Sequence, residues 1–311
     1  MNQDCNERYR KLPFELQRSL KNVYSRQARR GEPSPKDLLE IYDSLSWWNL
    51  FNSHWFDTLK CYTPSGNETI SLDTFLKDSE GVRVVTGTMG NKNVVVKSIN
   101  SKKHSIRSEM SYYLHLKEVG CPTPWFSTDF YFWGEPVLVI ELLSPLDAYD
   151  DEIQLGLQII DQLKFVHQFG CHSDIKPQNI MKKVTRDKKT GKRMKQYFLI
   201  DFGGVADEEM EEGYRRWIWT RKWTSQEPHS ADRIITCTND FVELAYVMRA
   251  IQIWRSKPVR KTPKDGSKDG DFRKIKDYSG RLLSFMKAVC DHEITDHKTL
   301  QSILRGKKHV K

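Results

Sequence analysis

The feature that most constrains this chain is a pair of loops that carry carboxylates, each next to a run of apolar residues. Residues 172–179 read His-Ser-Asp-Ile-Lys-Pro-Gln-Asn, and residues 201–203 read Asp-Phe-Gly. Phosphoryl transfer from Mg-ATP needs an Asp that orients a hydroxyl nucleophile, an Asn five residues later for one Mg²⁺, and an Asp on another loop for the bridging metal. Asp174, Asn179 and Asp201 occur in that order. Two such segments in this order rarely arise by chance, so the sequence predicts a fold that brings them together.

Length and charge limit the class of protein and its partners. At 311 residues the chain can bury one large core or two modest lobes. No apolar run reaches the length of a membrane span, and the first eight residues lack the hydrophobic stretch of a signal peptide, so we expect a cytoplasmic or nuclear protein. The formal net charge of +9 predicts anionic partners, namely acidic or already phosphorylated proteins, nucleic acid or nucleoprotein. Much of this charge lies in 182–195 and 306–311, for which a solvated basic face is the simpler interpretation.

The cysteines are expected to be reduced thiols. They are scattered along the chain without a C-x-x-C pair, which argues against a zinc site and against a disulfide framework. The six are Cys5, Cys61, Cys121, Cys171, Cys237 and Cys290.

The first seventy residues are predicted to form a helical extension. Apolar residues between Pro13 and Tyr24 recur near helical spacing. A second helix is predicted after Ser34, because residues 34–37 combine an N-cap serine, a proline at the first helical position and a carboxylate three residues on. The aromatic cluster at 47–56 is interpreted as packing against the small lobe, with a partner-binding surface as the alternative.

From about Ile70 the pattern becomes β-like. The segments 81–85 and 94–97 flank a turn predicted at 87–92, so we expect a hairpin that ends in Lys97. Glu109 lies on the next helical segment.

A buried strand and a long helix are predicted next along the chain. The strand is expected at 137–140, before the polar segment 141–145. The helix after it would be capped by Asp150 or Asp151 and would end near Gly170.

Residues from about 75 to 250 resemble a eukaryotic-type protein kinase, and within that superfamily they are most similar to the casein kinase 1 and vaccinia-related kinase branch. The stretches that carry the resemblance are Glu109 with 121–124, the hinge-like 141–145, 220–225 and 239–244. The resemblance implies an α+β, two-lobed fold with a helical N-terminal extension and with ATP in the cleft. The large lobe is short, as in compact kinases of large DNA viruses. The predicted boundaries are 1–70 for the extension, 71–143 for the small lobe and hinge, and 144–311 for the helical large lobe, with a polar insert near 256–277.

The resemblance also implies roles for individual residues. Asp174 would orient the acceptor hydroxyl and accept its proton, while Lys176 would stabilise the transferring phosphoryl group, as in serine/threonine kinases. Asn179 and Asp201 would hold Mg²⁺. The ATP contacts would come from Lys97 paired with Glu109, from Gly81, and from the hinge residues Ile140, Glu141 and Leu143. Three further contacts are implied, from Thr220 to the catalytic loop, from Glu227 to the end of the activation segment, and from Asp240 to the catalytic-loop backbone.

The chain departs from the family in two places. The segment 77–81 keeps Gly81 but lacks two glycines of the usual phosphate-binding loop, which weakens backbone donation to the phosphates. Ser173 replaces the arginine that normally pairs with a phosphorylated activation loop, so phosphorylation of that loop is not the expected switch. The acidic residues in 207–212 are candidates to take the place of a phosphate group, with the two arginines at 215–216 as their partners.

Three functions fit these observations. The leading one is a serine/threonine protein kinase that uses ATP and Mg²⁺. The alternative is a pseudokinase that acts as a binding module. The reduced glycine loop favours it, and the five catalytic-type residues Lys97, Asp174, Lys176, Asn179 and Asp201 oppose it. A small-molecule phosphotransferase is least favoured, because 220–227 resembles the peptide-positioning segment of protein kinases.

Overall fold

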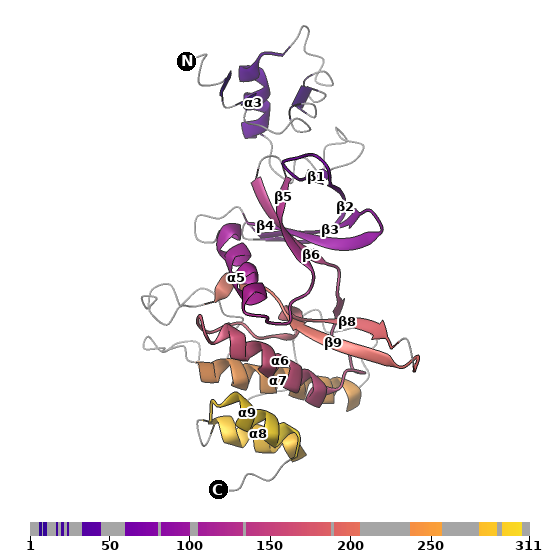
Figure 1. Ribbon diagram of the computed structural model, residues 1–311, viewed down its shortest axis with the longest axis vertical. Coiled ribbons are helices and arrows are strands. Elements are labelled where there is room, and N and C mark those ends of the chain that lie inside the picture. The colour runs from indigo at the N-terminus through magenta and orange to yellow at the C-terminus, as the bar shows by residue number, and fades with distance from the viewer. Residues whose placement is uncertain are drawn as a thin grey trace. The chain divides into compact units, whose positions relative to one another are not determined.

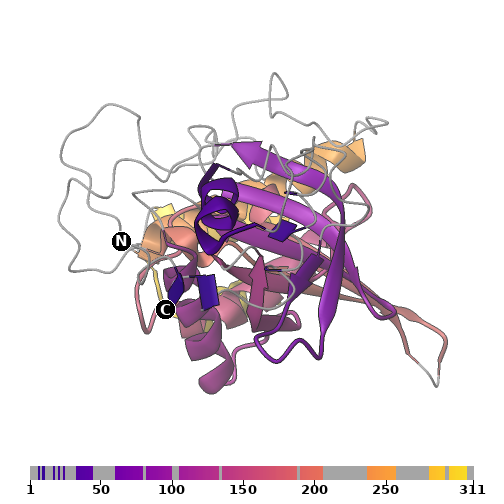
Figure 2. The same cartoon turned by 90° about the horizontal axis from the view of Figure 1, so that it is seen from above.

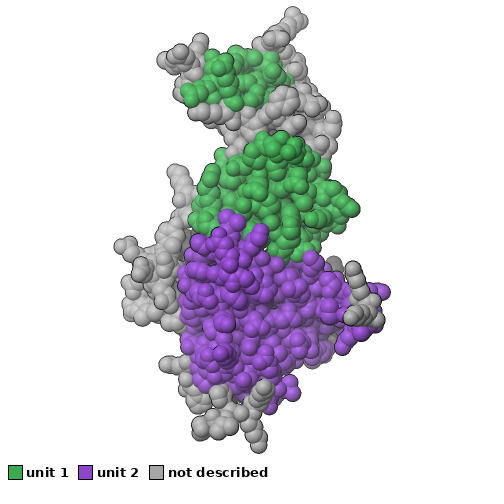
Figure 3. Space-filling view, viewed as in Figure 1, with its two compact units in different colours: residues 1–111, 124–142 green, residues 112–123, 143–311 purple. Residues whose placement is uncertain are grey.

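We describe the chain from a computed structural model (Figure 1). The structure describes residues 33–44, 60–79, 82–99, 105–132, 135–187, 190–205, 237–256, 280–290 and 294–306, together with isolated positions between 6 and 24. The chain divides into two compact units, residues 1–111 with 124–142, and residues 112–123 with 143–311 (Figure 3). The first unit is built mainly from strands and the second mainly from helices, which confirms the predicted α+β class.

Helix α3 (Pro35–Ser44) starts with the predicted capping box. The Asp37 N–H donates to Ser34 Oγ at 3.2 Å, and the Ser34 N–H donates to Asp37 Oδ2 at 2.9 Å. Each bond satisfies a backbone donor that the first turn of a helix leaves without a partner. The predicted aromatic cluster at 47–56 and most of the helix predicted at 13–24 lie outside the described residues.

The first unit contains a closed antiparallel barrel. Its strands are β1 (Lys60–Tyr62), β2 (Thr69–Ser79), β3 (Val82–Met89), β4 (Lys92–Ile99), β5 (Phe126–Phe132) and β6 (Glu135–Glu141). They are ordered β1-β2-β3-β4-β6-β5, and β1 closes the barrel by pairing with β5. The side chains of Val85, Val94, Val96, Val137 and Val139 are all fully buried. Alternating β-branched residues therefore supply much of the barrel's core.

Two details of the barrel differ from the prediction. Strand β1 and the start of β2 lie within 1–70, which was predicted to be helical. The prediction missed β1 because a three-residue strand is too short to show an alternating pattern. The turn between β3 and β4 is only Gly90-Asn91, with Gly90 at a φ of +58°, because residues 87–89 still pair with β4. A two-residue connection of this kind favours glycine. Gly87 also lets β2 approach closely, since a Cβ atom there would lie 2.7 Å from the Ser71 carbonyl oxygen.

The second unit consists of helices and one small sheet. The helices are α6 (Glu152–Val166), α7 (Cys237–Ser256), α8 (Gly280–Cys290) and α9 (His297–Leu304). The sheet is made of β7 (Ser144–Pro145), β8 (Ile180–Arg186) and β9 (Arg193–Leu199), and two 3-10 turns cover Pro177–Asn179 and Phe202–Gly204. Helix α5 (Ile106–Glu118) belongs to both units, because their boundary falls after Ser111. Among the helices that the structure describes, none is both long and apolar enough to span a bilayer.

Helix α7 forms the centre of the second unit. Its residues 240–248 are all buried, and α7 packs against both α6 and α8. A helix that is buried on nearly every side must satisfy its polar side chains internally. Asp240 and Glu243 are therefore expected to have partners within this unit.

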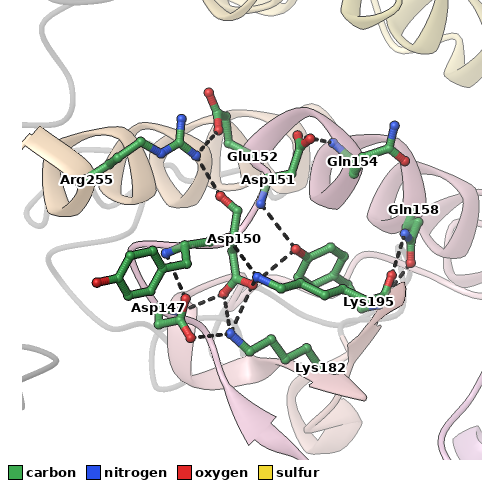
Figure 4. A network of polar contacts seen from close by, with 11 residues as sticks. Asp147, Asp150, Asp151, Glu152, Gln154, Gln158, Lys182, Lys195 and Arg255 are labelled. Atoms are coloured by element: carbon green, nitrogen blue, oxygen red, sulfur yellow. Dashed lines mark hydrogen bonds and ion pairs between the residues drawn. The ribbon is translucent and has the colours of Figure 1, made fainter. Parts of the chain in front are cut away.

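The β8–β9 hairpin is tied to the start of α6 by a buried network of charges (Figure 4). Asp150 is fully buried and pairs with Lys182 Nζ at 2.8 Å and Lys195 Nζ at 2.8 Å, and Lys182 also lies 2.6 Å from Asp147. Asp151 is the N-cap of α6 and was one of the two residues predicted to cap this helix. Figures 1 and 2 both show the far end of the hairpin projecting beyond α6, against which β9 packs.

This network corrects one part of a prediction. The basic segment 182–195 was interpreted as a solvated face, which holds for the exposed Arg186, Lys192 and Arg193, whereas Lys182 is only 4% exposed. The reason is that Asp150 neutralises it from a sequence position more than thirty residues earlier, which the local pattern does not show.

Candidate active site

The β8–β9 hairpin brings Asn179 and Asp201 to the same end of its two strands. Ile180 pairs with Leu199 at the base of the hairpin, and the Ile200 N–H donates to the Asn179 carbonyl oxygen at 2.9 Å. Asn179 therefore immediately precedes one strand, while Asp201 follows the end of the other. The hairpin is the physical reason why two polar residues 22 positions apart in the sequence lie at the same end of the small sheet.

The loop before β8 brings three of the predicted catalytic side chains into contact. Asn179 Nδ2 donates to the Asp174 carbonyl oxygen at 2.9 Å and to Asp174 Oδ2 at 3.1 Å. Lys176 Nζ forms an ion pair with the same Oδ2 atom. Because the Asn179 amide nitrogen faces Asp174, its Oδ1 oxygen is the atom left to bind a cation.

The pKa of Asp174 is shifted by burial and by the charged groups around it. Burial raises the pKa of Asp174, the charges of Lys176 and His172 act in the opposite direction, and the nearby carboxylate of Asp201 raises the pKa further. The net direction is upward. Two carboxylates that affect each other in this way make a place where a divalent cation would be stabilised.

Two residues of the site adopt left-handed backbone conformations. Ser173 has a φ of +66° and Asp201 a φ of +68°, and they are the only residues other than glycine with positive φ among those that the structure describes. Such conformations cost of order 1–3 kcal/mol and persist only where the surrounding structure holds them. The strain is therefore concentrated on the two loops that the sequence singled out.

Helix α7 holds the strained loop with two buried carboxylates. Asp240 accepts hydrogen bonds from the N–H groups of His172 and Ser173, both at 2.8 Å, which confirms the predicted contact between Asp240 and the loop backbone. Glu243 Oε2 accepts from the Ile175 N–H at 2.9 Å. Burial raises the pKa of Glu243 well above its ordinary value, and the neighbouring Asp240 adds to that effect.

Glu243 was missed by the sequence interpretation. The sequence pattern that could have identified it is the position of Glu243 one helical turn after Asp240, within an otherwise apolar run. This spacing places the two carboxylates on one side of α7. A buried carboxylate in such a run needs a polar partner, and here the partner is the loop.

The predicted ion pair between Lys97 and Glu109 forms within the first unit. Lys97 Nζ lies 2.9 Å from Glu109 Oε1 and 2.7 Å from Oε2. Lys97 is near the end of β4, opposite Val84 on one side and Leu138 on the other, and Glu109 is in the first turn of α5. Both side chains are buried, so the carboxylate fixes the direction in which the ammonium group points.

The hinge-like segment differs in part from the prediction. Ile140 is buried at the end of β6, as expected for a residue behind a pocket. The Glu141 N–H donates to Trp125, and the Leu142 N–H donates to Asn93, each at 2.9 Å. Neither N–H is therefore available to donate to a ligand, because both extend the pairing of β6 with its neighbouring strands. The carbonyl oxygens of this segment were also predicted to bind the adenine edge, and that part stays a prediction. No backbone hydrogen bond from the Leu143 N–H occurs among the described residues, so Leu143 is the remaining candidate donor.

Several predicted residues lie outside the part of the chain that the structure describes. They are Gly81, the acidic and arginine residues of 207–216, Thr220, Glu227 and most of the polar insert near 256–277. Their predicted roles stay predictions.

Comparison with known proteins supports the fold. No protein-family sequence model and no curated protein sequence matches the chain. Among solved structures, vaccinia related kinase 3 is similar with a TM-score of 0.53 and 15% identity, over 86% of this chain and 93% of that chain. A kinase domain from Plasmodium is similar with a TM-score of 0.42 and 15% identity, over 76% and 89%. The first likeness shows a protein-kinase-like fold, which confirms the predicted fold. The predicted branch within the superfamily and the viral origin stay predictions.

Proposed function

We propose that this protein is a serine/threonine protein kinase that transfers the γ-phosphoryl group of ATP to protein hydroxyls. The observation that carries the proposal is the arrangement of the loop at 172–179, where Asp174 is in contact with both Lys176 and Asn179. This loop is held in a strained conformation by buried carboxylates on α7. A structural loop would not need that combination, whereas phosphoryl transfer depends on positioned charges.

The donor set suits Mg²⁺. Among the described residues no group of three or more His, Cys, Asp and Glu side chains could hold a metal ion by itself. Mg²⁺ is usually held by one or two protein ligands together with substrate phosphates and water, so this does not conflict with the proposal. Asp201 and the Oδ1 atom of Asn179 would hold the ion, which would neutralise charge on the phosphates of bound ATP.

Each remaining residue has a role that its contacts suggest. Asp174 would accept a hydrogen bond from the acceptor hydroxyl and take its proton. Lys176, already close to that carboxylate, would stabilise charge on the transferring phosphoryl group. Lys97, oriented by Glu109, would bind the α- and β-phosphates, and the Leu143 N–H would donate to the adenine edge.

The preference for Ser and Thr and the substrate class are also part of the proposal. A lysine two residues after the catalytic Asp, as at Lys176, is typical of serine/threonine kinases. The net charge of +9 favours acidic or already phosphorylated protein substrates. The proposed location is cytoplasmic or nuclear, since such substrates and ATP are available there.

The test is transfer of labelled phosphate from Mg-ATP to casein and to the protein itself. Wild type and Asp174→Asn would be purified identically, and circular dichroism would verify that both are folded. The proposal expects incorporation on serine or threonine in wild type and its loss in the variant. Binding of ATP without transfer in either protein would instead favour the pseudokinase. Phosphotyrosine as the product would refute the proposed specificity.

A further inference from the structure

Two cysteines meet next to the loop at 172–179. Cys171 immediately precedes the loop, Cys237 is the first residue of α7, and their Sγ atoms lie 3.3 Å apart. None of the described cysteines is in a disulfide. The pair could not be predicted from the sequence, because the two residues are 66 positions apart.

The surroundings make the two thiols chemically different. Cys171 is buried, whereas Cys237 is partly exposed and therefore open to a small oxidant. The hydrogen bond with Cys171 and the nearby imidazole of His167 lower the pKa of Cys237, and the start of a helix also favours a negative charge. Cys237 is thus suited to attack an oxidant, and Cys171 is placed to react with the product.

We propose that Cys171 and Cys237 form a reversible disulfide when the protein meets a hydroperoxide. The Cys237 thiolate attacks a peroxide oxygen of H₂O₂, the O–O bond breaks, and the released hydroxide takes a proton to become water. Sulfur of Cys171 then attacks the resulting Cys237 sulfenic acid. The S–S bond forms as the S–O bond breaks, and the departing hydroxide leaves as water with the Cys171 proton. Two thiols are oxidised and one peroxide is reduced to two waters, and an external dithiol reverses the change.

This disulfide would act on the same two segments that Asp240 already connects. Cys171 neighbours His172, and Cys237 lies three residues before Asp240, which accepts a hydrogen bond from the His172 N–H at 2.8 Å. A disulfide has an S–S distance of about 2.05 Å, so the two sulfurs must approach by about 1.2 Å. The bond would therefore change the position of the loop relative to α7 or freeze its movement.

The first experiment maps the disulfide directly. The full chain, freed of reductant, is titrated with H₂O₂, acid-quenched, alkylated and digested without reduction, and mass spectrometry searches for a Cys171–Cys237 peptide. Wild type and Cys290→Ser should give this cross-link, and Cys237→Ser should not. Cys290→Ser is the matched control because it removes another accessible thiol. The proposal is overturned if Cys237 is oxidised to the sulfenic or sulfinic acid without the cross-link, or if Cys171 resists oxidation throughout.

The second experiment measures the effect on the loop. Hydrogen exchange at the peptide containing His172 and Ser173 should differ between the reduced and oxidised protein and should return after dithiothreitol. Identical exchange in both states would refute the link to the loop.

A loss of kinase activity on oxidation is a further expectation that rests on the proposed function. Since a misplacement of about 1 Å can cost about 100-fold in rate, a loss of that order is expected. Cross-link mapping does not depend on activity, so a failure of the kinase proposal would be recognised separately.

Discussion

Replacement of Asp240 by Asn tests whether this carboxylate holds the loop. The wild-type carboxylate accepts three hydrogen bonds, from the N–H groups of His172 and Ser173 at 2.8 Å and from His167 Nε2 at 3.0 Å. An asparagine has one oxygen and one NH₂ group, so a donor must face another donor. The lost acceptor costs about 2 kcal/mol, and the loss of the Asp240 charge beside the buried imidazolium of His167 costs about as much again. We expect Asp240→Asn to lower the free energy of unfolding by about 4 kcal/mol at pH 6.

The cost should depend on pH in a definite direction. Burial opposes the charged form of His167, but the hydrogen bonds to Asp240 and Cys237 outweigh it and raise the pKa of His167 to about 9 from an ordinary value of 6.5. The pKa of His167 is higher in the folded than in the unfolded protein. The stabilisation that the protonated His167 gives the folded state is therefore fully present below pH 6.5 and is lost as the pH rises through 9. Once His167 is neutral, the loss of the Asp240 charge no longer adds to the cost of the substitution. The cost of Asp240→Asn should therefore fall to about 2 kcal/mol above pH 9.

The assay is urea unfolding followed by tryptophan fluorescence at several pH values. The difference in the free energy of unfolding between wild type and variant, taken at each pH, is the diagnostic quantity. Asp129→Asn, at an exposed carboxylate on β5, is the control and should change stability by less than about 0.5 kcal/mol. A cost that is the same at pH 6 and above pH 9, or that grows with pH, would refute the coupling of Asp240 to His167.

Three further substitutions test other parts of the structure. Glu109→Gln removes the carboxylate that pairs with the buried Lys97 and should cost on the order of 3 kcal/mol, visible as a lower melting temperature, together with weaker ATP binding by calorimetry. Gly87→Ala places a Cβ 2.7 Å from a carbonyl oxygen of β2 and should cost about 1–3 kcal/mol in urea unfolding; an unchanged midpoint would mean that the strands can separate. Lys182→Met removes one of the cations that pair with the fully buried Asp150 and should cost about 3 kcal/mol, with faster hydrogen exchange in β8; protection equal to that of wild type would contradict the structural role of the network.

The sequence predicted those parts of the fold and site that depend on local pattern. The hairpin before Lys97, the capping box at Ser34 and the N-cap Asp151 follow from strand alternation and from residues within one helical turn. The contact of Asp240 with the loop followed from the family resemblance. These predictions needed no knowledge of which distant segments pack together.

What the sequence did not reveal are pairings between distant segments. Asp150 with Lys182, Glu243 with Ile175, and Cys171 with Cys237 join residues 32, 68 and 66 positions apart. In each case one member looks ordinary in its own segment, a surface lysine, a helix carboxylate or an isolated thiol. Only the packing of α6, β8 and α7 decides that these groups are buried together and must satisfy one another.

The dependence of the loop on α7 has a consequence for the time at which the loop forms. The residues that hold His172, Ser173 and Ile175 are synthesised 67 or 68 positions later. At about 5–20 residues per second, α6 and the β8–β9 hairpin leave the ribosome several seconds before the carboxylates of α7 become available. Contacts of such long separation also carry a large loop-closure cost and form late in folding. We therefore expect the loop at 172–179 to take up its strained conformation after α6 and the β8–β9 hairpin have formed.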